Sequence, residues 1–398
     1  MIFTKKTNIL QILFLLLILS SCKQKNTPEA KTVVKKPIET SLLIQQGPKL
    51  TAAYIKSKKN SIIHYYNKTW PRESANGGFM VAKNGQIIYE KYEGLANYKE
   101  KSAMTSTTPI HIASVSKVVT ATAILKLVSA KKLYLDQKVN TILKEFPYPD
   151  VTVRTLLNHR SGMRNYAYFT EKKGVWDRHK ILSNQDILTI MATKDIDLEF
   201  RSNSRFGYCN TNYAMLALVI EKVTSLSYQD AMRKIVFKPL GMTNTYVFDY
   251  EKDKLTATPS YRRNFSMVNW DYLDAIYGDK NIYSTPRDLL KFDNGRNSPK
   301  FMDPKLLKEA YIPYSNEYKG TKNYGLGIRM INWSSGKNFY YHNGWWHGSM
   351  ASYVTLPEEK VTIIALSNKY DKRVYKARKL AALFGDYPFH LDDFEKGE

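Results

Sequence analysis

The chain has 398 residues, of which 43% are hydrophobic and 13% aromatic, and its 60 Lys and Arg residues against 36 Asp and Glu residues give a formal net charge of +24. This is the composition of a globular protein that buries one large core, or two smaller cores sharing a cleft. A basic surface attracts polyanions, so nucleic acid, anionic lipid and acidic cell-envelope polymers are all candidate partners. The cations form short scattered groups without a polybasic tail or a nucleic-acid-binding motif, and we interpret them mainly as a solvated surface.

The first 21 residues have the pattern of a secretory signal. Lys5 and Lys6 precede an apolar run over 9–19 that is too short and too early for a globular helix or a full membrane span. The following Leu19-Ser20-Ser21-Cys22 resembles the lipobox of bacterial lipoproteins, which implies a lipid on Cys22. An ordinary signal peptide or an uncleaved anchor is the alternative. We therefore expect a lipid-anchored protein of the bacterial cell envelope, facing the periplasm or the exterior, and export argues against a nucleic-acid partner.

Residues 22–46 are polar and lack apolar periodicity, so we expect a flexible tether there. The remaining 47–398 should form one catalytic module, with a helical subdomain at roughly 130–275. Cys209 is the only other cysteine, and with Cys22 lipidated no disulfide can form within the chain.

Hydrophobic patterns along the module predict strands at both ends and helices between them. Two alternating segments, 78–83 and 86–90, flank Asn84-Gly85, the favoured pair for a two-residue hairpin turn. Apolar residues then recur at helical spacing from 118 to 128. Further helices are expected around 153–157, 187–191 and 213–223, and strands at 324–331, 351–356 and 361–366. The order predicts an α/β fold whose sheet is built from both chain ends, with an all-α domain inserted between them and a cleft at their junction.

Ser114 and Lys117 lie at the start of the predicted helix at 118–128. A serine hydroxyl is a weak nucleophile unless a base lies within hydrogen-bond reach, and residues three apart on a helix share a face. Lysine can be that base only where burial or neighbouring cations lower its pKa. The S-x-x-K pattern is weak by itself, because it also begins at Ser20, Ser129 and Ser334. Only Ser114 opens a long apolar helix.

Three motifs in a fixed order extend the argument. The segment His111-Ile112-Ala113-Ser114-Val115-Ser116-Lys117 resembles the nucleophile motif of the serine β-lactamase and penicillin-recognising superfamily. The segment Tyr208-Cys209-Asn210 resembles the second motif, Y-x-N, and His342-Asn343-Gly344 resembles the third, K-T-G or H-x-G. The resemblance spans about 75–370 and includes the class C β-lactamases, the D-alanyl-D-alanine carboxypeptidases and their esterase relatives. It implies an antiparallel sheet flanked by helices, the β-lactamase/transpeptidase-like fold.

The resemblance also implies roles for individual residues. Ser114 would be the acylated nucleophile, Lys117 its proton acceptor or the electrostatic support for one, and Tyr208 the shuttle to the leaving group. Asn210 would hold the acyl side chain. His342 replaces a cationic residue: neutral, it could hydrogen-bond Tyr208, and charged, it could attract a substrate carboxylate. These two alternatives stay open.

The family draws its oxyanion donors from the backbone of the nucleophile and of the residue after the third motif, here Ser114 and Trp345. Gly344 would allow close approach of the strand. Asn343 and Trp345 depart from the common K-T-G-S/T pattern, which argues against β-lactam hydrolysis. Trp345 and Trp346 could line an apolar substrate pocket, although strand alternation should direct only one of them to the cleft.

The other candidate groups have simpler interpretations. His111 and His159 are expected to be structural or to support the site, and Cys209 to lie in the core. No spacing of His, Cys or carboxylates predicts a metal site, and no cofactor is implied. The sequence thus predicts a serine hydrolase acting on an amide or ester of a small molecule or peptide, with D-alanyl peptides, esters and β-lactams as candidates. A non-catalytic envelope-binding protein of the same fold is the alternative.

Overall fold

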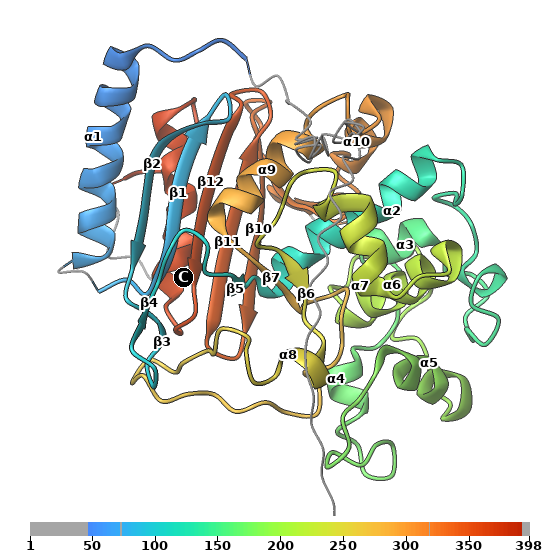
Figure 1. The fold of residues 1–398 in the computed structure, drawn as a ribbon. Helices are drawn as coiled ribbons and strands as arrows, with labels where there is room; N and C mark the ends of the chain where they lie inside the picture. The colour runs from blue at the N-terminus through green and yellow to red at the C-terminus, as the bar shows by residue number, and fades with distance from the viewer. Residues whose placement is uncertain (1–46, 72–73, 318, 392–398) are drawn as a thin grey trace, which may run out of the picture. The chain divides into compact units, whose positions relative to one another are not determined.

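The computed structural model describes residues 47–71, 74–317 and 319–391 (Figure 1). The predicted signal at 1–21, the lipid site at Cys22 and the tether at 22–46 lie outside the described residues. Among the described residues, no helix combines the length and the apolar character needed to cross a membrane.

A seven-stranded antiparallel sheet is the centre of the fold (Figure 1). In spatial order its strands are β2 (Gln86–Glu93), β1 (Gly77–Lys83), β12 (Val361–Ser367), β11 (Ser349–Leu356), β10 (Asn338–Trp346), β9 (Arg329–Asn332) and β8 (Lys322–Tyr324). The first strand of the chain pairs with the last, in a register that places Gly77 opposite Ser367. The prediction of an α/β fold with a sheet built from both chain ends is therefore confirmed.

The hairpin of β1 and β2 forms where the sequence predicts it. Asn84 and Gly85 connect the strands with φ of 51° and 71°. Two consecutive positive φ values are what a type I′ turn requires, and Asn-Gly adopts them at low cost.

The strand predicted over 324–331 is wrong in one respect, because two strands replace it. β8 ends at Tyr324 and β9 begins at Arg329. Gly327 between them has φ of 84°, and a Cβ at this position would lie 2.2 Å from the Cβ of Ala121. The chain leaves the sheet here to pack against the helix that carries Ala121, and only glycine allows that approach.

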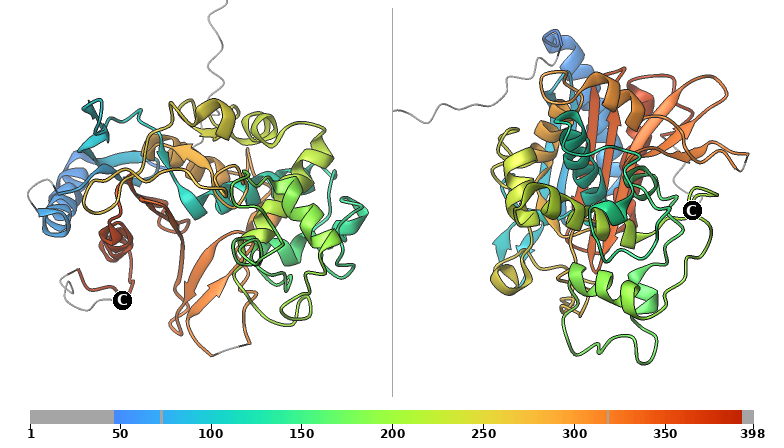
Figure 2. Two further views of the ribbon diagram at one scale, coloured as in Figure 1. Left: turned by 90° about the horizontal axis from the view of Figure 1, so that it is seen from below. Right: turned by 90° about the vertical axis from the view of Figure 1, so that its right-hand side faces the viewer.

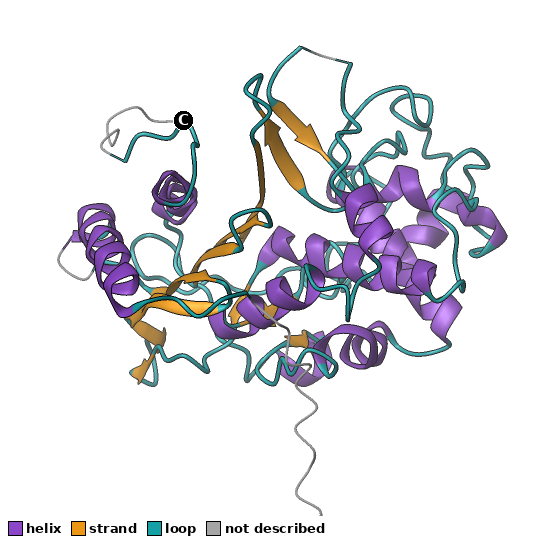
Figure 3. Cartoon of the chain, turned by 90° about the horizontal axis from the view of Figure 1, so that it is seen from above, coloured by secondary structure: helices purple, strands orange, loops and turns teal. Residues whose placement is uncertain are grey.

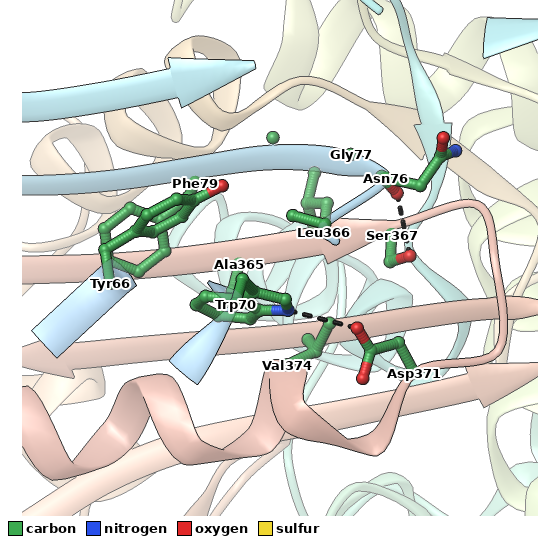
Figure 4. Close-up of a pocket in the computed structure, with 12 residues that line it drawn as sticks. Tyr66, Trp70, Asn76, Gly77, Phe79, Ala365, Leu366, Ser367, Asp371 and Val374 are labelled. Carbon is green, nitrogen blue, oxygen red and sulfur yellow. Dashed lines mark hydrogen bonds between the residues drawn. The ribbon is translucent and has the colours of Figure 1, made fainter. Parts of the chain in front are cut away.

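One face of the sheet is covered by α1 (Ala52–Thr69) and by a 3₁₀ helix over Lys372–Leu383 (Figure 3). Figure 4 shows this packing: Tyr66 of α1 and Trp70, directly after that helix, lie against Phe79 of β1. The indole N–H of Trp70 donates to Asp371 at 3.0 Å. The space left between them is about 10 Å³, room for at most one water molecule. This layer is structural.

The other helices lie on the opposite side of the sheet, where α9 packs against β1 and β12. They are α2 (Ser116–Ser129), α3 (Val153–Leu157), α4 (Tyr166–Phe169), α5 (Asn184–Thr193), α6 (Asn210–Thr224), α7 (Tyr228–Met232), α8 (Tyr250–Asp253), α9 (Pro286–Arg296) and α10 (Pro304–Ala310). Short strands β3 (Leu95–Asn97) and β4 (Ser102–Ala103) form a hairpin, while β5 (Ile110–His111), β6 (Tyr246–Val247) and β7 (Ile282–Ser284) form a three-stranded sheet. In the left view of Figure 2, the mostly green helical segment and the blue α1 lie on opposite sides of the main sheet.

The hydrophobic core is continuous from the sheet into the helical segment. It joins Met80 and Leu366 of the sheet to Val118 of α2 and to Leu216 and Val219 of α6. Helix α6 is buried continuously from Thr211 to Ile220, because apolar residues occupy most of these positions rather than a single stripe. The helical insertion and the sheet therefore position the residues between them rigidly.

Candidate active site

Ser114 and Lys117 meet at the start of α2. Ser114 lies half-buried in a single 3₁₀ turn, Ala113–Val115, and Lys117 lies in the first turn of the following helix. The Lys117 Nζ donates to Ser114 Oγ at 3.1 Å and to the backbone carbonyl of Asp279 at 2.8 Å. Its side chain is fully buried. Both partners of this amine are uncharged.

The backbone before the nucleophile is held in an unusual conformation. Ala113 has φ of 46°, a left-handed value that costs a non-glycine residue about 1 kcal/mol or more. The Ala113 N–H donates to Nδ1 of His111 at 3.1 Å, and the backbone N–H of Ile112 donates to the carbonyl of Ile282 in β7 at 2.9 Å. His111 thus supports the nucleophile segment, as the sequence predicts. Burial is the main cause that lowers its pKa to about 4.

Tyr208 lies between three other groups of the site. The Nζ of Lys117 is 5.2 Å from the centroid of its ring, and the guanidinium carbon of Arg329 is 4.6 Å from the same centroid. The ring of His159 packs on it at 4.4 Å. The structure therefore brings Tyr208 to Ser114 and Lys117, together with a cation that sequence reasoning missed.

Arg329 is that cation. Burial alone would lower its pKa, but the hydroxyl groups of Tyr208 and Tyr324 beside it raise the pKa above its ordinary value. The sequence signal that could have identified Arg329 is its position as a lone arginine in the apolar segment 325–331. Arginine is rare in buried strands unless it has a partner or a function. No carboxylate is among the groups that contribute most to the pKa of Arg329. Arg329 is half-buried and retains access to solvent.

The charge of His342, left open above, is decided by its surroundings. Its Nδ1–H donates to the carbonyl of Asn343 at 2.8 Å, and its Nε2 accepts from the hydroxyl of Tyr324 at 3.1 Å. Complete burial, followed by the charge of Arg329, holds its pKa well below the ordinary value. His342 is therefore neutral near pH 7, and its hydrogen bond goes to Tyr324 and not to Tyr208.

His159 anchors the second motif. Its Nδ1 accepts from the backbone N–H of Cys209 at 3.2 Å and from the amide of Asn212 at 3.0 Å, and its carbonyl accepts from the N–H of Gly207 at 2.9 Å. The backbone on both sides of Tyr208 is thus fixed by one residue. Cys209 lies in the core, as expected, and burial raises the pKa of its thiol to about 11. A thiolate nucleophile is not available there.

Asn210 opens α6 next to Tyr208. Within the part of the chain that the structure describes, its side-chain oxygen is buried and has no hydrogen-bond partner. A buried amide oxygen without a partner is costly, so its position is consistent with contact to a bound substrate.

Gly344 brings β10 against the nucleophile. A Cβ on Gly344 would lie 2.4 Å from the carbonyl of Ile112 and 3.0 Å from the backbone nitrogen of Ser114. Gly344 therefore allows the expected close approach, and the segment that β10 approaches is the one that carries the nucleophile.

The pairing of β10 also sets the direction of the Trp345 N–H. The two-residue turn His347-Gly348 joins Trp346 to Ser349, and the pair that flanks such a turn is a hydrogen-bonded pair. Because hydrogen-bonded and non-hydrogen-bonded pairs alternate along an antiparallel ladder, the next pair, Trp345 and Met350, exchanges no backbone hydrogen bonds. The Trp345 N–H consequently points away from β11, toward the edge where β9 pairs only as far as Tyr341. This edge adjoins Ser114 through Gly344.

The two tryptophans differ in environment, as strand alternation predicts. Trp346 shares a face with His342 and Gly344; its indole N–H donates to Asp274 at 2.7 Å. Trp345 is 61% exposed and donates to the carbonyl of His347. Asn343 and Trp345 lie on the strand face opposite to His342, so their side chains do not share the face that meets the nucleophile.

A buried polar cluster behind Lys117 was also missed by sequence reasoning. Lys280 donates to the hydroxyl of Tyr166 at 2.7 Å, and this hydroxyl donates to Asp279 at 2.8 Å. Burial is the main cause that lowers the pKa of Lys280, opposed by Asp279. The motif-poor segment 274–281 gives no pattern that would have revealed it.

Asp271, Asp274 and His347 form a grouping that the sequence spacing did not predict. One potential ligand atom of each lies within 4.8 Å of the others. Asp274 already accepts hydrogen bonds from the indole N–H of Trp346 and from Nε2 of His347 at 2.9 Å. The cluster thereby fixes the turn between β10 and β11.

Known proteins resemble this chain in sequence and in fold. Residues 71–385 match the Beta-lactamase family. Penicillin-binding protein 4* of Bacillus subtilis (strain 168) is 30% identical over 350 residues, covering 83% of this chain and 77% of that protein. A D-aminopeptidase of Brucella anthropi is 25% identical over 303 residues, which are 73% of this chain and 56% of the relative, so the chain spans little more than half of that enzyme's length.

A solved structure extends the likeness to the fold. The crystal structure of the penicillin binding protein from Bacillus halodurans matches with a TM-score of 0.70 at 24% identity, over 81% of this chain and 98% of that one. The family match covers most of the chain and includes all three motifs described above. The chain therefore belongs to the β-lactamase family of serine hydrolases.

Proposed function

We propose that this chain cleaves an amide bond at the end of a peptide that terminates in a D-amino acid with a free carboxylate, through an acyl-enzyme on Ser114. The observation that carries the proposal is the fully buried amine of Lys117, 3.1 Å from Ser114 Oγ, with only uncharged groups as hydrogen-bond partners. A base of this kind activates a serine that is otherwise unreactive.

The reaction follows from the positions of these groups. Ser114 Oγ attacks the substrate carbonyl, and its proton passes to Lys117 Nζ. The C–N bond then breaks as Tyr208, adjacent to Lys117, relays the proton to the departing amine. The D-amino acid leaves, and water hydrolyses the acyl ester to restore Ser114.

Negative charge on the attacked oxygen needs two fixed donors. The backbone N–H groups of Ser114 and Trp345 are the candidates, because Gly344 brings the two segments together and the Trp345 N–H points to the open edge of β10. Backbone donors in such a site cost no reorganisation when the charge develops.

Arg329 supports a substrate with a free carboxylate. With His342 neutral, the guanidinium of Arg329 replaces it as the candidate partner for an anionic substrate group. The names of two relatives, a penicillin-binding protein and a D-aminopeptidase, are consistent with a substrate that contains a D-amino acid. An aminopeptidase acts at the other end of a peptide, where the substrate carries an amine. The half-buried guanidinium of Arg329 favours the end that carries a carboxylate.

Export and membrane attachment remain part of the proposal. The motif Leu19-Ser20-Ser21-Cys22 supports a lipid on Cys22, so the enzyme would act at the cell envelope on peptides of the wall. Incorporation of labelled palmitate into the full chain, lost in Cys22→Ser, is the expected result, and labelling that persists in that variant would contradict the anchor.

The hydrolytic proposal is tested by turnover of N-acylated D-alanyl-D-alanine peptides. We expect the wild type to release D-alanine and Ser114→Ala to be inactive, whereas Ser129→Ala retains full activity. Ser129 is a matched control because it begins another S-x-x-K sequence but lies exposed at the end of α2. Release of D-alanine at equal rates by wild type and Ser114→Ala would overturn the assignment. No turnover of any D-alanyl peptide, ester or β-lactam by the wild type would favour the envelope-binding alternative.

A further inference from the structure

A second cavity lies at the far end of α2 from Ser114. Its volume is about 430 Å³, within the range of 300–1,000 Å³ that is typical of small-molecule sites. The lining residues come from the ends of α2 and α6, from the segment after α7 and from the loop after α9. With a rise of 1.5 Å per residue, the length of α2 separates this cavity from Ser114 by roughly 20 Å.

The wall of the cavity is apolar. Leu127 and Phe301 are buried, and Leu226, Ile235 and Pro239 are half-buried around the opening. Apolar side chains left partly in contact with water gain stability when a ligand covers them, by about 25 cal/mol per Å² of area removed from water. An apolar chain is the complementary ligand for this wall.

Four cations surround the same opening, and its lining contains no acidic residue. They are Lys126, Lys132, Lys234 and Lys300. In the part of the chain that the structure describes, none of the four forms an ion pair with a carboxylate. Asp230, which lines an adjoining surface depression together with Lys234, is paired with Arg233 at 3.6 Å.

The ammonium group of Lys126 is drawn into the cavity wall. It lies 4.5 Å from the ring centroid of Phe301 and donates to the backbone carbonyl of that residue. Burial lowers its pKa. A neighbouring anion would compensate for this loss of hydration.

An uncommon helical segment contributes to the site. Residues Arg233–Phe237 form a π-helical turn that supplies Lys234 and Ile235 to the lining. Such turns are rare and occur frequently at functional positions, because they place side chains where a regular helix would not.

From the apolar wall, the surrounding lysines and the volume, we propose that this cavity binds an anionic amphiphile, a medium-chain fatty acid. Its chain would cover the half-buried Leu226, Ile235 and Pro239, and its carboxylate would lie among the lysines. The site is separate from the hydrolytic one and does not depend on it. A polyanion is a poorer fit, since its successive charges would meet an apolar wall.

Calorimetric titration of the Ser114→Ala chain with decanoate tests the proposal, using decanol as the neutral analogue. We expect saturable binding of one decanoate and binding of decanol weaker by about tenfold. The double variant Lys234→Met/Lys300→Met should lose about tenfold in decanoate affinity. The control Lys305→Met/Lys308→Met removes the same charge from exposed positions on α10 and should leave affinity unchanged.

A variant that fills the cavity localises the binding. Ala130→Trp places a large ring at a small, exposed lining residue, so decanoate binding should be lost while hydrolysis at Ser114 in the otherwise wild-type chain is kept. The proposal is overturned if decanoate does not bind, if decanol binds as tightly, or if the cavity variants bind decanoate as well as the control does.

Discussion

At the scale of single residues, the charges around Tyr208 determine what the site can bind. Lys117 is directed at Ser114, and His342 is kept neutral by burial and by the neighbouring charge of Arg329. Arg329 is the cation whose electrostatic partners are tyrosine hydroxyls, which a substrate carboxylate can replace as the stronger partner.

Arg329→Gln should therefore weaken cleavage of peptides with a free terminal carboxylate. We expect kcat/KM to fall by roughly 10- to 100-fold, because a hydrogen bond to a charged group contributes about 1.5–3 kcal/mol. The matched substrate is the same peptide with a terminal amide, for which wild type and variant should differ little. Equal losses on both substrates would mean that Arg329 acts on Tyr208 and not on the substrate.

His111 predicts a pH dependence of stability. Its pKa is about 4 in the folded chain and near 6.5 when unfolded, so only the unfolded chain takes up a proton between these values. The contribution of neutral His111 is therefore complete above pH 6.5 and is lost as pH falls toward 4, by up to about 1.4 kcal/mol per pH unit.

The measurement is urea unfolding of wild type and His111→Gln from pH 7.5 to 4.5. The advantage of the wild type should shrink as pH falls through this range. His179→Gln, at an exposed position, is the control and should show a constant difference. A pH-independent difference for His111→Gln would contradict the buried, neutral state.

Sequence reasoning assigned Ser114, Lys117 and Tyr208 because motif order identified them, and the structure brings all three together. Arg329 was missed because a single arginine has no motif, and its significance depends on β9 bringing it over the ring of Tyr208. The charge of His342 likewise depends on burial and on Arg329, neither of which is local in the sequence.

At the scale of elements, β10 packs directly against the nucleophile turn. Gly344 leaves no room for a Cβ beside Ile112 and Ser114. The predicted strand over 324–331 failed at a similar contact, because the loop around Gly327 packs on α2. Periodicity identifies apolar segments but does not show where a glycine lets two backbones meet.

Gly344→Ala should separate β10 from Ser114. A displacement of about 1 Å costs roughly 100-fold in rate, so we expect kcat to fall by at least that factor. Overpacking should lower the unfolding free energy by about 1–3 kcal/mol. Gly336→Ala is the control: its φ of 84° makes alanine unfavourable, but no atom lies within 4 Å of the new Cβ and the position is in a distant turn. Its activity should be unchanged, and an active Gly344→Ala enzyme would refute the proposed contact.

At the scale of the whole molecule, the sheet joins the beginning of the module to its end and holds the helical segment against one face. The order of predicted elements indicated this architecture, because a strand pair, a helical middle and returning strands favour one sheet shared by both chain ends. The pairing that closes this sheet, β1 with β12, is visible only in the structure. The continuity of the core between sheet and helices could not be predicted, since it arises from packing between distant segments.

This architecture places one activated serine where the sheet meets the helices, and covalent labelling tests that claim most directly. The chain is treated with a fluorophosphonate probe and with a penicillin, and intact mass is followed by peptide mapping. We predict one adduct, on the peptide containing Ser114, in the wild type and in Ser129→Ala, and none in Ser114→Ala. An adduct of the same stoichiometry in Ser114→Ala, or one that maps to another serine, would contradict the account.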